Sequence, residues 1–157
     1  VAKRALGFDM KVLAYDPYMK HEDNLPGISL MSFEDVLEQA DYVSLHAALT
    51  EETRHMIGAD QLKIMKPSAY FINTSRGALV DEEALYTALT QKQIAGAALD
   101  VFNEEPPKDS PLLGLENLVV TPHIGAHTRE SIERVGIMAA ENVLRTLKGG
   151  QPHNRVA

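Results

Sequence analysis

Short apolar runs alternate with amphipathic segments along the chain. The β-prone runs are apolar almost throughout, which is typical of strands buried in a parallel sheet. They occupy residues 11–15, 41–46, 70–73, 94–102 and 118–120. Helices are predicted between them at 33–39, 59–65 and 81–91. This order predicts an α/β fold, a doubly wound parallel sheet covered on both sides by helices.

Local signals mark where the predicted helices begin and end. Ser32, with Asp35 three residues later, resembles a capping box, and the acidic residues at 81–83 favour a helix start. The stretch 128–148 has apolar residues three and four apart and stops at Gly149. These signals add a long C-terminal helix to the predicted fold.

The first residues also have a helical pattern. Val1, Ala2, Ala5 and Leu6 fall at helical spacing, and Gly7 suits the end of a helix. No capping residue precedes them, and the sequence does not begin with Met. We therefore expect an upstream segment to be missing; an ordinary short N-terminal helix is the alternative.

Composition and charge narrow the classes of function. The 157 residues are 45% hydrophobic, and 15 Lys+Arg against 22 Asp+Glu give a net charge of −7. This acidity argues against nucleic-acid binding, which needs a clustered basic face, and no apolar run suits a membrane span. The absence of cysteine excludes disulfides and thiol nucleophiles. It also fits a reducing compartment, so we expect a cytoplasmic protein.

Polar residues gather where the predicted strands end, at the edge where ligands bind in open α/β sheets. They are Asp16, His46 and the segments 73–77, 100–105 and 121–126. Asp16 follows the first strand, where a carboxylate can accept hydrogen bonds from both hydroxyls of an adenosine ribose. An ordinary turn with Pro17 explains Asp16 equally well.

Three charged residues in these loops have the chemistry of an acid–base site. The guanidinium of Arg76 suits bidentate capture of a substrate carboxylate, although a surface salt bridge is the more common role of a lone arginine. His123 can deliver a proton near neutral pH, and a carboxylate such as Glu105 beside it would favour the charged ring. Considered alone, the last two fit solvated loop residues better.

The remaining histidines carry less information. His46 and His127 fit packing or capping positions. His21, His55 and His153 lack the spacing of metal ligands. No metal site is therefore predicted.

Longer motifs follow one another in a recognisable order. They are VLAYDPY (12–18), ADYVSLHAALTEET (40–53), FINTSRGALVDEEAL (71–85), GAALDVFNEEPP (96–107) and NLVVTPHIGAHTRES (117–131). Together they resemble the D-isomer-specific 2-hydroxyacid dehydrogenases, which include phosphoglycerate dehydrogenase and glyoxylate/hydroxypyruvate reductase. The resemblance covers essentially the whole chain. It implies a Rossmann-like domain that transfers a hydride between NAD(H) and a D-2-hydroxy acid or 2-keto acid, such as 3-phosphoglycerate, glyoxylate or hydroxypyruvate.

The resemblance also assigns roles to individual residues. Arg76, Glu105 and His123 match the family's catalytic trio. Arg76 would bind the substrate carboxylate, His123 would protonate the carbonyl oxygen, and Glu105 would orient the imidazole ring. Asp16 matches the acid that binds the adenosine ribose, which implies NAD over NADP. The other positions expected to line the cofactor are Ala47, Thr53, Thr74, Asp100, Gly125 and Ala126, together with Arg76 and His123.

Two parts of the family pattern are missing from the sequence. The glycine-rich G-x-G-x-x-G loop should lie just before Val1, and the substrate domain is absent. Ala48 also stands where family members usually carry proline. We therefore expect residues 1–127 to form an incomplete dinucleotide-binding domain, and 128–157 a helix and tail that would return to the substrate domain. The isolated chain is expected to be inactive.

Two other functions compete with this interpretation. One is a non-catalytic nucleotide-sensing or interaction module, which would not need the catalytic trio. The other is a related Rossmann enzyme such as an NAD-using nucleoside hydrolase, against which NTSRG (73–77) and DVFNEEPP (100–107) argue. The family further implies a homodimer with a small-molecule substrate. The apolar stripe of 128–148 is expected to have lost a partner.

Overall fold

The protein is described here by a computed structural model that covers residues 1–19 and 26–154. Contacts divide the chain into two compact units, residues 1–122 and residues 123–157. The described strands all belong to the first unit, and the long C-terminal helix belongs to the second.

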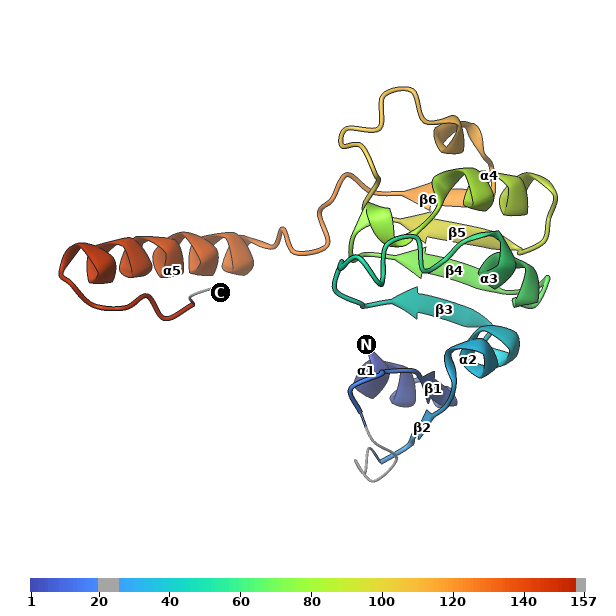
Figure 1. The fold of residues 1–157 in the computed structure, drawn as a ribbon, viewed down its shortest axis with the longest axis horizontal. Coiled ribbons are helices and arrows are strands. Elements are labelled where there is room, and N and C mark those ends of the chain that lie inside the picture. Colours follow the sequence, from blue (N-terminus) through green and yellow to red (C-terminus); the bar gives the residue numbers. More distant parts are fainter. Residues whose placement is uncertain (20–25, 155–157) are drawn as a thin grey trace. The chain divides into compact units, whose positions relative to one another are not determined.

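Parallel strands of the first unit form two sheets (Figure 1). β1 (Val12–Ala14) pairs with β2 (Ile28–Leu30) in one sheet. The other sheet has the order β3 (Tyr42–Leu45), β4 (Tyr70–Asn73), β5 (Gly96–Leu99) and β6 (Leu118–Val120). The predicted parallel sheet is thus confirmed. β2 was not predicted, because its short run of three residues follows a polar segment and a Pro-Gly turn.

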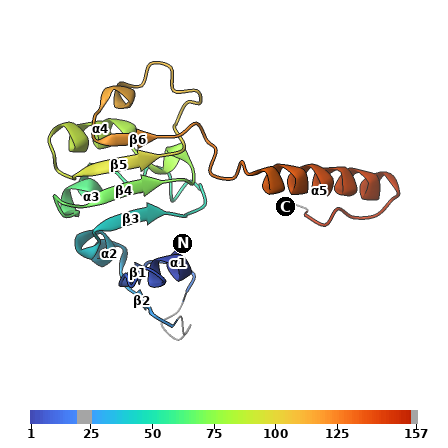
Figure 2. The same ribbon diagram turned by 180° about the vertical axis from the view of Figure 1, so that it is seen from behind.

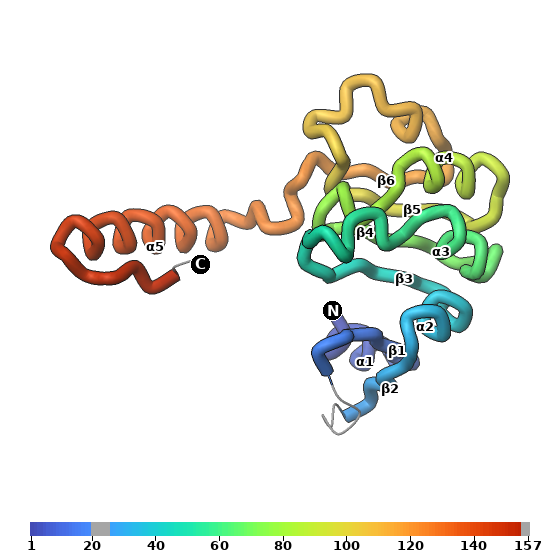
Figure 3. Tube along the Cα trace, in the orientation of Figure 1, coloured from blue at the N-terminus to red at the C-terminus, as the bar shows by residue number. Residues whose placement is uncertain are grey.

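Helices precede and connect these strands along the path traced in Figure 3. They are α1 (Ala2–Leu6), α2 (Phe33–Gln39), α3 (Ala59–Ile64) and α4 (Glu82–Thr90), with short 3₁₀ helices at Gly77–Leu79 and Pro111–Gly114. The predicted cap of α2 is confirmed, since Ser32 Oγ accepts a hydrogen bond from the Asp35 N–H at 3.1 Å. Gly7 does follow α1, but with φ −70° it does not use the left-handed freedom of glycine.

The side chains of β3 and β4 alternate between a buried face and an open face. Val43, Leu45 and Phe71 point into the core, where they pack with buried residues of α2, α3 and α4. On the opposite face Tyr42 and Tyr70 stack with ring centroids 5.7 Å apart, and both are exposed. Figure 2 shows this sheet from behind, with α3 and α4 on its far side. Helices α2, α3 and α4 therefore pack on one face of β3–β6.

The second unit contains α5 (Arg129–Leu147), which begins after Thr128 as the predicted helix 128–148 requires. Thr128 Oγ1 accepts a hydrogen bond from the Ser131 N–H at 3.1 Å and so caps the helix. No residue of α5 is buried, although Ile132, Val135 and Val143 are apolar. Among the described residues, no helix is both long and apolar enough to span a membrane.

Candidate functional site

Backbone and side-chain hydrogen bonds join the carboxyl ends of β3–β6 into one edge. The Ser75 hydroxyl, just after β4, donates to the Leu45 carbonyl at the end of β3 at 2.9 Å. The Asp100 N–H donates to the Asn73 carbonyl at 3.0 Å, and the Thr121 N–H donates to the Leu99 carbonyl at 3.0 Å. The loops that carry Thr74, Arg76, Asp100 and Glu105 therefore start side by side, as expected for parallel strands.

Asn73 shapes the loop that carries Arg76. Its side chain is fully buried; Oδ1 accepts the Ser75 N–H at 3.0 Å, and Nδ2 donates to the Arg76 carbonyl at 2.9 Å. This local bonding fixes the backbone on both sides of Thr74, which is exposed. The Arg76 side chain is exposed too, and its Nη1 donates to the Ser75 carbonyl at 2.7 Å. A guanidinium held at a strand end and open to solvent can receive a carboxylate.

The loop after β5 lies directly against the Arg76 loop. A Cβ atom on Gly77 would overlap the backbone of Phe102 and Asn103, so only glycine allows this approach. The Phe102 N–H donates to Glu105 Oε1 at 3.1 Å, which folds the Glu105 carboxylate back onto its own loop. Arg76 and Glu105 therefore lie on two loops in backbone contact.

Asp100 is a buried acid at the end of β5. Only 5% of its surface is exposed, and its carboxylate accepts a hydrogen bond from the Thr121 hydroxyl at the end of β6. A buried carboxylate needs such donors, since an unpaired charge is costly in the protein interior. This hydrogen bond holds the carboxylate of Asp100, an expected cofactor residue, against Thr121 at the end of the neighbouring strand.

The loop after β3 is held by its own hydroxyl groups and by the loop after β4. Thr53 Oγ1 donates to the Ala48 carbonyl at 2.7 Å and accepts the Thr50 N–H at 2.8 Å. The His55 N–H donates to the Ala78 carbonyl at 2.8 Å. Ala47 is half-buried at the start of this loop. The Thr53 side chain thus has a clear role in shaping the loop, which the sequence did not indicate.

His46 stands at the end of β3, on the open face of the sheet. Its Nε2 lies 2.9 Å from the Ser44 hydroxyl. Partial burial lowers the pKa of His46 below its ordinary value of 6.5. A neutral imidazole ring can accept a hydrogen bond from the Ser44 hydroxyl, so this pair of residues fits a packing role at the sheet edge.

Asp16 lies two residues beyond β1, in the smaller sheet. Its Oδ1 accepts the Tyr18 N–H at 2.9 Å, so the turn role considered for this residue is present. Asp16 is exposed, and this bond uses one oxygen of the carboxylate. The ribose role for Asp16 stays a prediction.

The remaining predicted residues belong to the second unit. His123, Gly125 and Ala126 are exposed and precede α5. His123 has φ 54°, a left-handed conformation that is uncommon for residues other than glycine and recurs at functional sites. Arg76 and Glu105 are in the first unit, so their meeting with His123 stays a prediction from the resemblance.

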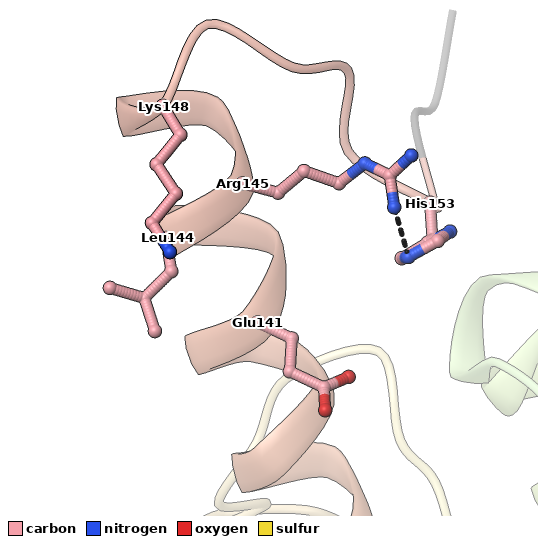
Figure 4. Close-up of a pocket in the computed structure, with 5 residues that line it drawn as sticks. All are labelled: Glu141, Leu144, Arg145, Lys148 and His153. Carbon is pink, nitrogen blue, oxygen red and sulfur yellow. Dashed lines mark hydrogen bonds between the residues drawn. The ribbon is translucent and has the colours of Figure 1, made fainter.

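A pocket of about 390 Å³ lies at the end of α5, and no predicted site residue lines it (Figure 4). It is lined by Glu141, Leu144, Arg145, Lys148 and His153. Arg145 Nη1 lies 2.7 Å from His153 Nε2, so the histidine that received no role packs on this helix. In the part of the chain that the structure describes, no three His, Asp or Glu residues form a group suited to a metal.

A parallel α/β sheet with a polar carboxyl edge is typical of nucleotide-binding proteins. Residues 1–125 match the family model for the NAD binding domain of D-isomer specific 2-hydroxyacid dehydrogenases. The chain belongs to this family, and the resemblance seen in the sequence is confirmed.

Three comparisons illustrate the match. A glyoxylate reductase of Korarchaeum cryptofilum is 48% identical over 99% of this chain and 48% of the relative. The D-lactate dehydrogenase of Lactobacillus jensenii, solved with NAD⁺, superposes with a TM-score of 0.88 at 32% identity, over 99% of this chain and 51% of that structure. An acyclic imino acid reductase (Bsp5), solved with NADPH and D-Arg, gives a TM-score of 0.85 at 35% identity, over 99% of this chain and 49% of that structure. The chain spans about half the length of these relatives.

Proposed function

We propose that the chain forms the NAD(H)-binding and catalytic part of a D-2-hydroxyacid dehydrogenase. The reaction interconverts a 2-keto acid and a D-2-hydroxy acid, with glyoxylate, hydroxypyruvate or the 3-phosphoglycerate couple as candidate substrates. The observation that carries this proposal is the backbone contact between the Arg76 loop and the Glu105 loop at Gly77. Substrate capture and proton transfer need residues from both loops at one edge of the sheet. The comparisons give no support to the non-catalytic alternative.

The residues present fit two ends of the cofactor. The exposed carboxylate of Asp16 can accept ribose hydroxyls, and the buried carboxylate of Asp100, fixed by Thr121, can accept an N–H of the nicotinamide carboxamide. Ala47, Thr53, Thr74, Gly125 and Ala126 remain proposed lining positions. When bound, the nicotinamide supplies or accepts the hydride.

The pyrophosphate site is the part of the cofactor site that this sequence does not supply. No G-x-G-x-x-G occurs in the sequence. In the doubly wound order 3-2-1-4-5-6, strand 1 carries this loop and lies between strands 2 and 4. Here β2 and β1 correspond to strands 3 and 2, and β3 begins the other half; no strand in the described residues pairs with both β1 and β3. We propose that a strand and glycine loop beyond these residues complete the site.

The chain's own groups account for substrate binding and proton transfer. The Arg76 guanidinium binds the substrate carboxylate and draws electron density from the adjacent carbonyl. His123 donates a proton to the carbonyl oxygen during reduction and accepts it from the hydroxyl during oxidation. Glu105 orients the His123 ring and favours its charged form.

The test is steady-state kinetics of the complete protein that carries this chain, with NADH and glyoxylate, hydroxypyruvate or phosphohydroxypyruvate. His123→Gln should lower kcat by roughly 10²–10⁴-fold, as expected for a lost general acid. Arg76→Gln should chiefly raise KM for the keto acid, and Arg145→Gln, at the far end of α5, should change neither. Absence of NADH oxidation with all three acids would exclude the proposed function.

Three further properties are proposed with it. The cofactor-binding part extends to residue 127, beyond the family match that ends at 125, and residues 128–157 form a helix and tail that contact a substrate domain. A homodimer is supported by the open sheet face around Tyr42, Tyr70 and Val119. A cytoplasmic location is supported by the absence of cysteine. Sedimentation of the complete protein and localisation of a tagged copy test the last two.

A further inference from the structure

The first turn of α4 makes one hydrogen bond to a distant loop, and this bond plays no part in capping the helix. Glu82 Oε1 accepts a hydrogen bond from the Asn103 N–H at 2.7 Å, linking residues that are 21 positions apart. Helix capping is carried out by the neighbouring Asp81, whose Oδ1 accepts the N–H groups of Glu83 and Ala84 at 3.0 and 3.1 Å. Glu82 is half-buried, whereas Glu83 is exposed. The Glu82 carboxylate is therefore directed to another loop.

The peptide that Glu82 binds is the one that packs on Gly77. The backbone of Phe102 and Asn103 lies against Gly77, directly after Arg76. The Phe102 N–H, one residue before the bound amide, donates to Glu105 Oε1 at 3.1 Å. Contact with Gly77 limits how closely this peptide approaches, and the bond to Glu82 prevents it from lifting away. A charge-assisted bond of this length is stronger than a bond between neutral groups.

We propose that Glu82 is a positioning residue for the candidate active site. Its carboxylate holds the 102–105 loop against the 74–77 loop and so sets the place of Glu105 relative to Arg76. The catalytic consequence rests on the proposed function. A displacement of about 1 Å at reacting groups can cost roughly 100-fold in rate, so a loop held by one peptide contact is a sensitive point.

An acidic residue in a first turn also interacts with the helix dipole, and this effect has to be separated from the proposed one. Glu83 provides the matched control, since it carries the same charge in the same turn without a described bond to Asn103. Glu82→Gln provides the conservative variant, because the Gln Oε1 can accept the same N–H. Glu82→Ala removes the acceptor.

The first experiment measures amide hydrogen exchange of Asn103 by NMR in the 157-residue chain. Glu82→Ala should speed exchange of this amide about tenfold, because its hydrogen bond is lost. Glu83→Ala should leave it within about twofold, and Glu82→Gln should retain most of the protection. Equal exchange in the two alanine variants would overturn the proposal, whatever the chain's activity.

The second experiment measures keto-acid reduction by the complete protein. Glu82→Ala should lower kcat about tenfold while KM for NADH changes less than about twofold, because the reacting groups move and the ribose site does not. Glu82→Gln should restore most of kcat, and Glu83→Ala should resemble the wild type. Unchanged kcat in Glu82→Ala, or a loss that Glu82→Gln does not restore, would overturn the catalytic part. If the wild type reduces no keto acid, the proposed function fails, and the Asn103 amide alone then decides whether Glu82 holds the loop.

Discussion

Gly77 lies against the backbone of Phe102 so closely that a Cβ atom on Gly77 would overlap the Phe102 carbonyl carbon. The contact is between two backbones, so no side-chain rotation can relieve it. It sets the spacing between the loop that carries Arg76 and the loop that carries Glu105. The relative position of these two candidate catalytic residues therefore depends on backbone packing at Gly77.

Gly77→Ala should destabilise the chain by about 1–3 kcal/mol, the usual range when an extra carbon is forced into a packed site. Urea unfolding followed by circular dichroism measures this change. Gly114→Ala is the matched control, because a Cβ at Gly114 would have no neighbour within 4 Å. Equal unfolding midpoints for the two variants would contradict the proposed backbone contact.

The sequence predicted the parts of the molecule that depend on local pattern. Apolar runs identified β3–β6, and the structure confirms the predicted helix start at Ser32 and the predicted long C-terminal helix. It missed β2, whose short run follows a polar segment and a Pro-Gly turn and has a polar residue, Ser29, at its centre. The bond of Glu82 to Asn103 was also missed, because it joins the first turn of α4 to the loop after β5 and no motif links the two. Only the glycine beside Arg76 offered a hint of close approach.

The positions of site residues were predictable where a residue directly follows a strand. They were less predictable where the loop conformation determines the contacts of a side chain. Asp100 and Thr121 follow neighbouring strands, so their contact follows from topology. Thr53 was assigned to the cofactor, yet its hydroxyl donates to the Ala48 carbonyl inside its own loop. Such bonds depend on the loop conformation, which hydrophobic periodicity does not encode.

The complete protein should use NADH in preference to NADPH. A 2′-phosphate would lie beside the Asp16 carboxylate, and Lys11, the nearest cation before it, precedes the strand. Lys20, the next cation after Asp16, lies outside the described residues. The measurement is kcat/KM for both cofactors, and Asp16→Ala should reduce the preference about tenfold, near the energy of one close charge pair. A wild-type preference for NADPH would contradict the ribose role of Asp16.

Acid should weaken the fold through His46. Its pKa in the folded chain is below the ordinary 6.5, chiefly because of burial. Between these two pKa values the unfolded chain binds more protons, so the free energy of unfolding should fall as the pH drops below about 6.5. Above that pH the histidine is neutral in both states and the effect disappears.

NMR titration of the His46 ring and urea unfolding between pH 5.5 and 7.5 test this prediction. His46→Asn should flatten the fall in stability relative to wild type. His55→Asn is the control, because the contact of His55 with Ala78 uses the backbone, whereas the contact of His46 with Ser44 uses the ring. A titration midpoint for His46 above that of a model histidine would contradict the burial argument.

The apolar stripe of α5 should bind a hydrophobic dye or drive association of the 157-residue chain. Ile132, Val135 and Leu147 are 60%, 66% and 78% exposed, and exposed apolar patches favour association. Ile132→Ser with Val135→Ser should reduce dye fluorescence and shift sedimentation towards the monomer. Glu133→Ser, on the same turn, should do neither. A monomeric wild type without dye binding would show that the stripe needs no partner.

The 157-residue polypeptide by itself should show no measurable dehydrogenase turnover. Hydride transfer needs the nicotinamide and the substrate carbonyl held at near-attack distance, and such positioning supplies roughly 7–11 kcal/mol of the barrier. Arg76, Glu105 and His123 cannot replace it, because the sequence has no glycine loop to anchor the pyrophosphate. The assay is NADH oxidation with glyoxylate and hydroxypyruvate, run beside the complete protein as a positive control. Robust turnover by the 157 residues would mean that the edges of β1 and β3 form a working cofactor site without a strand between them.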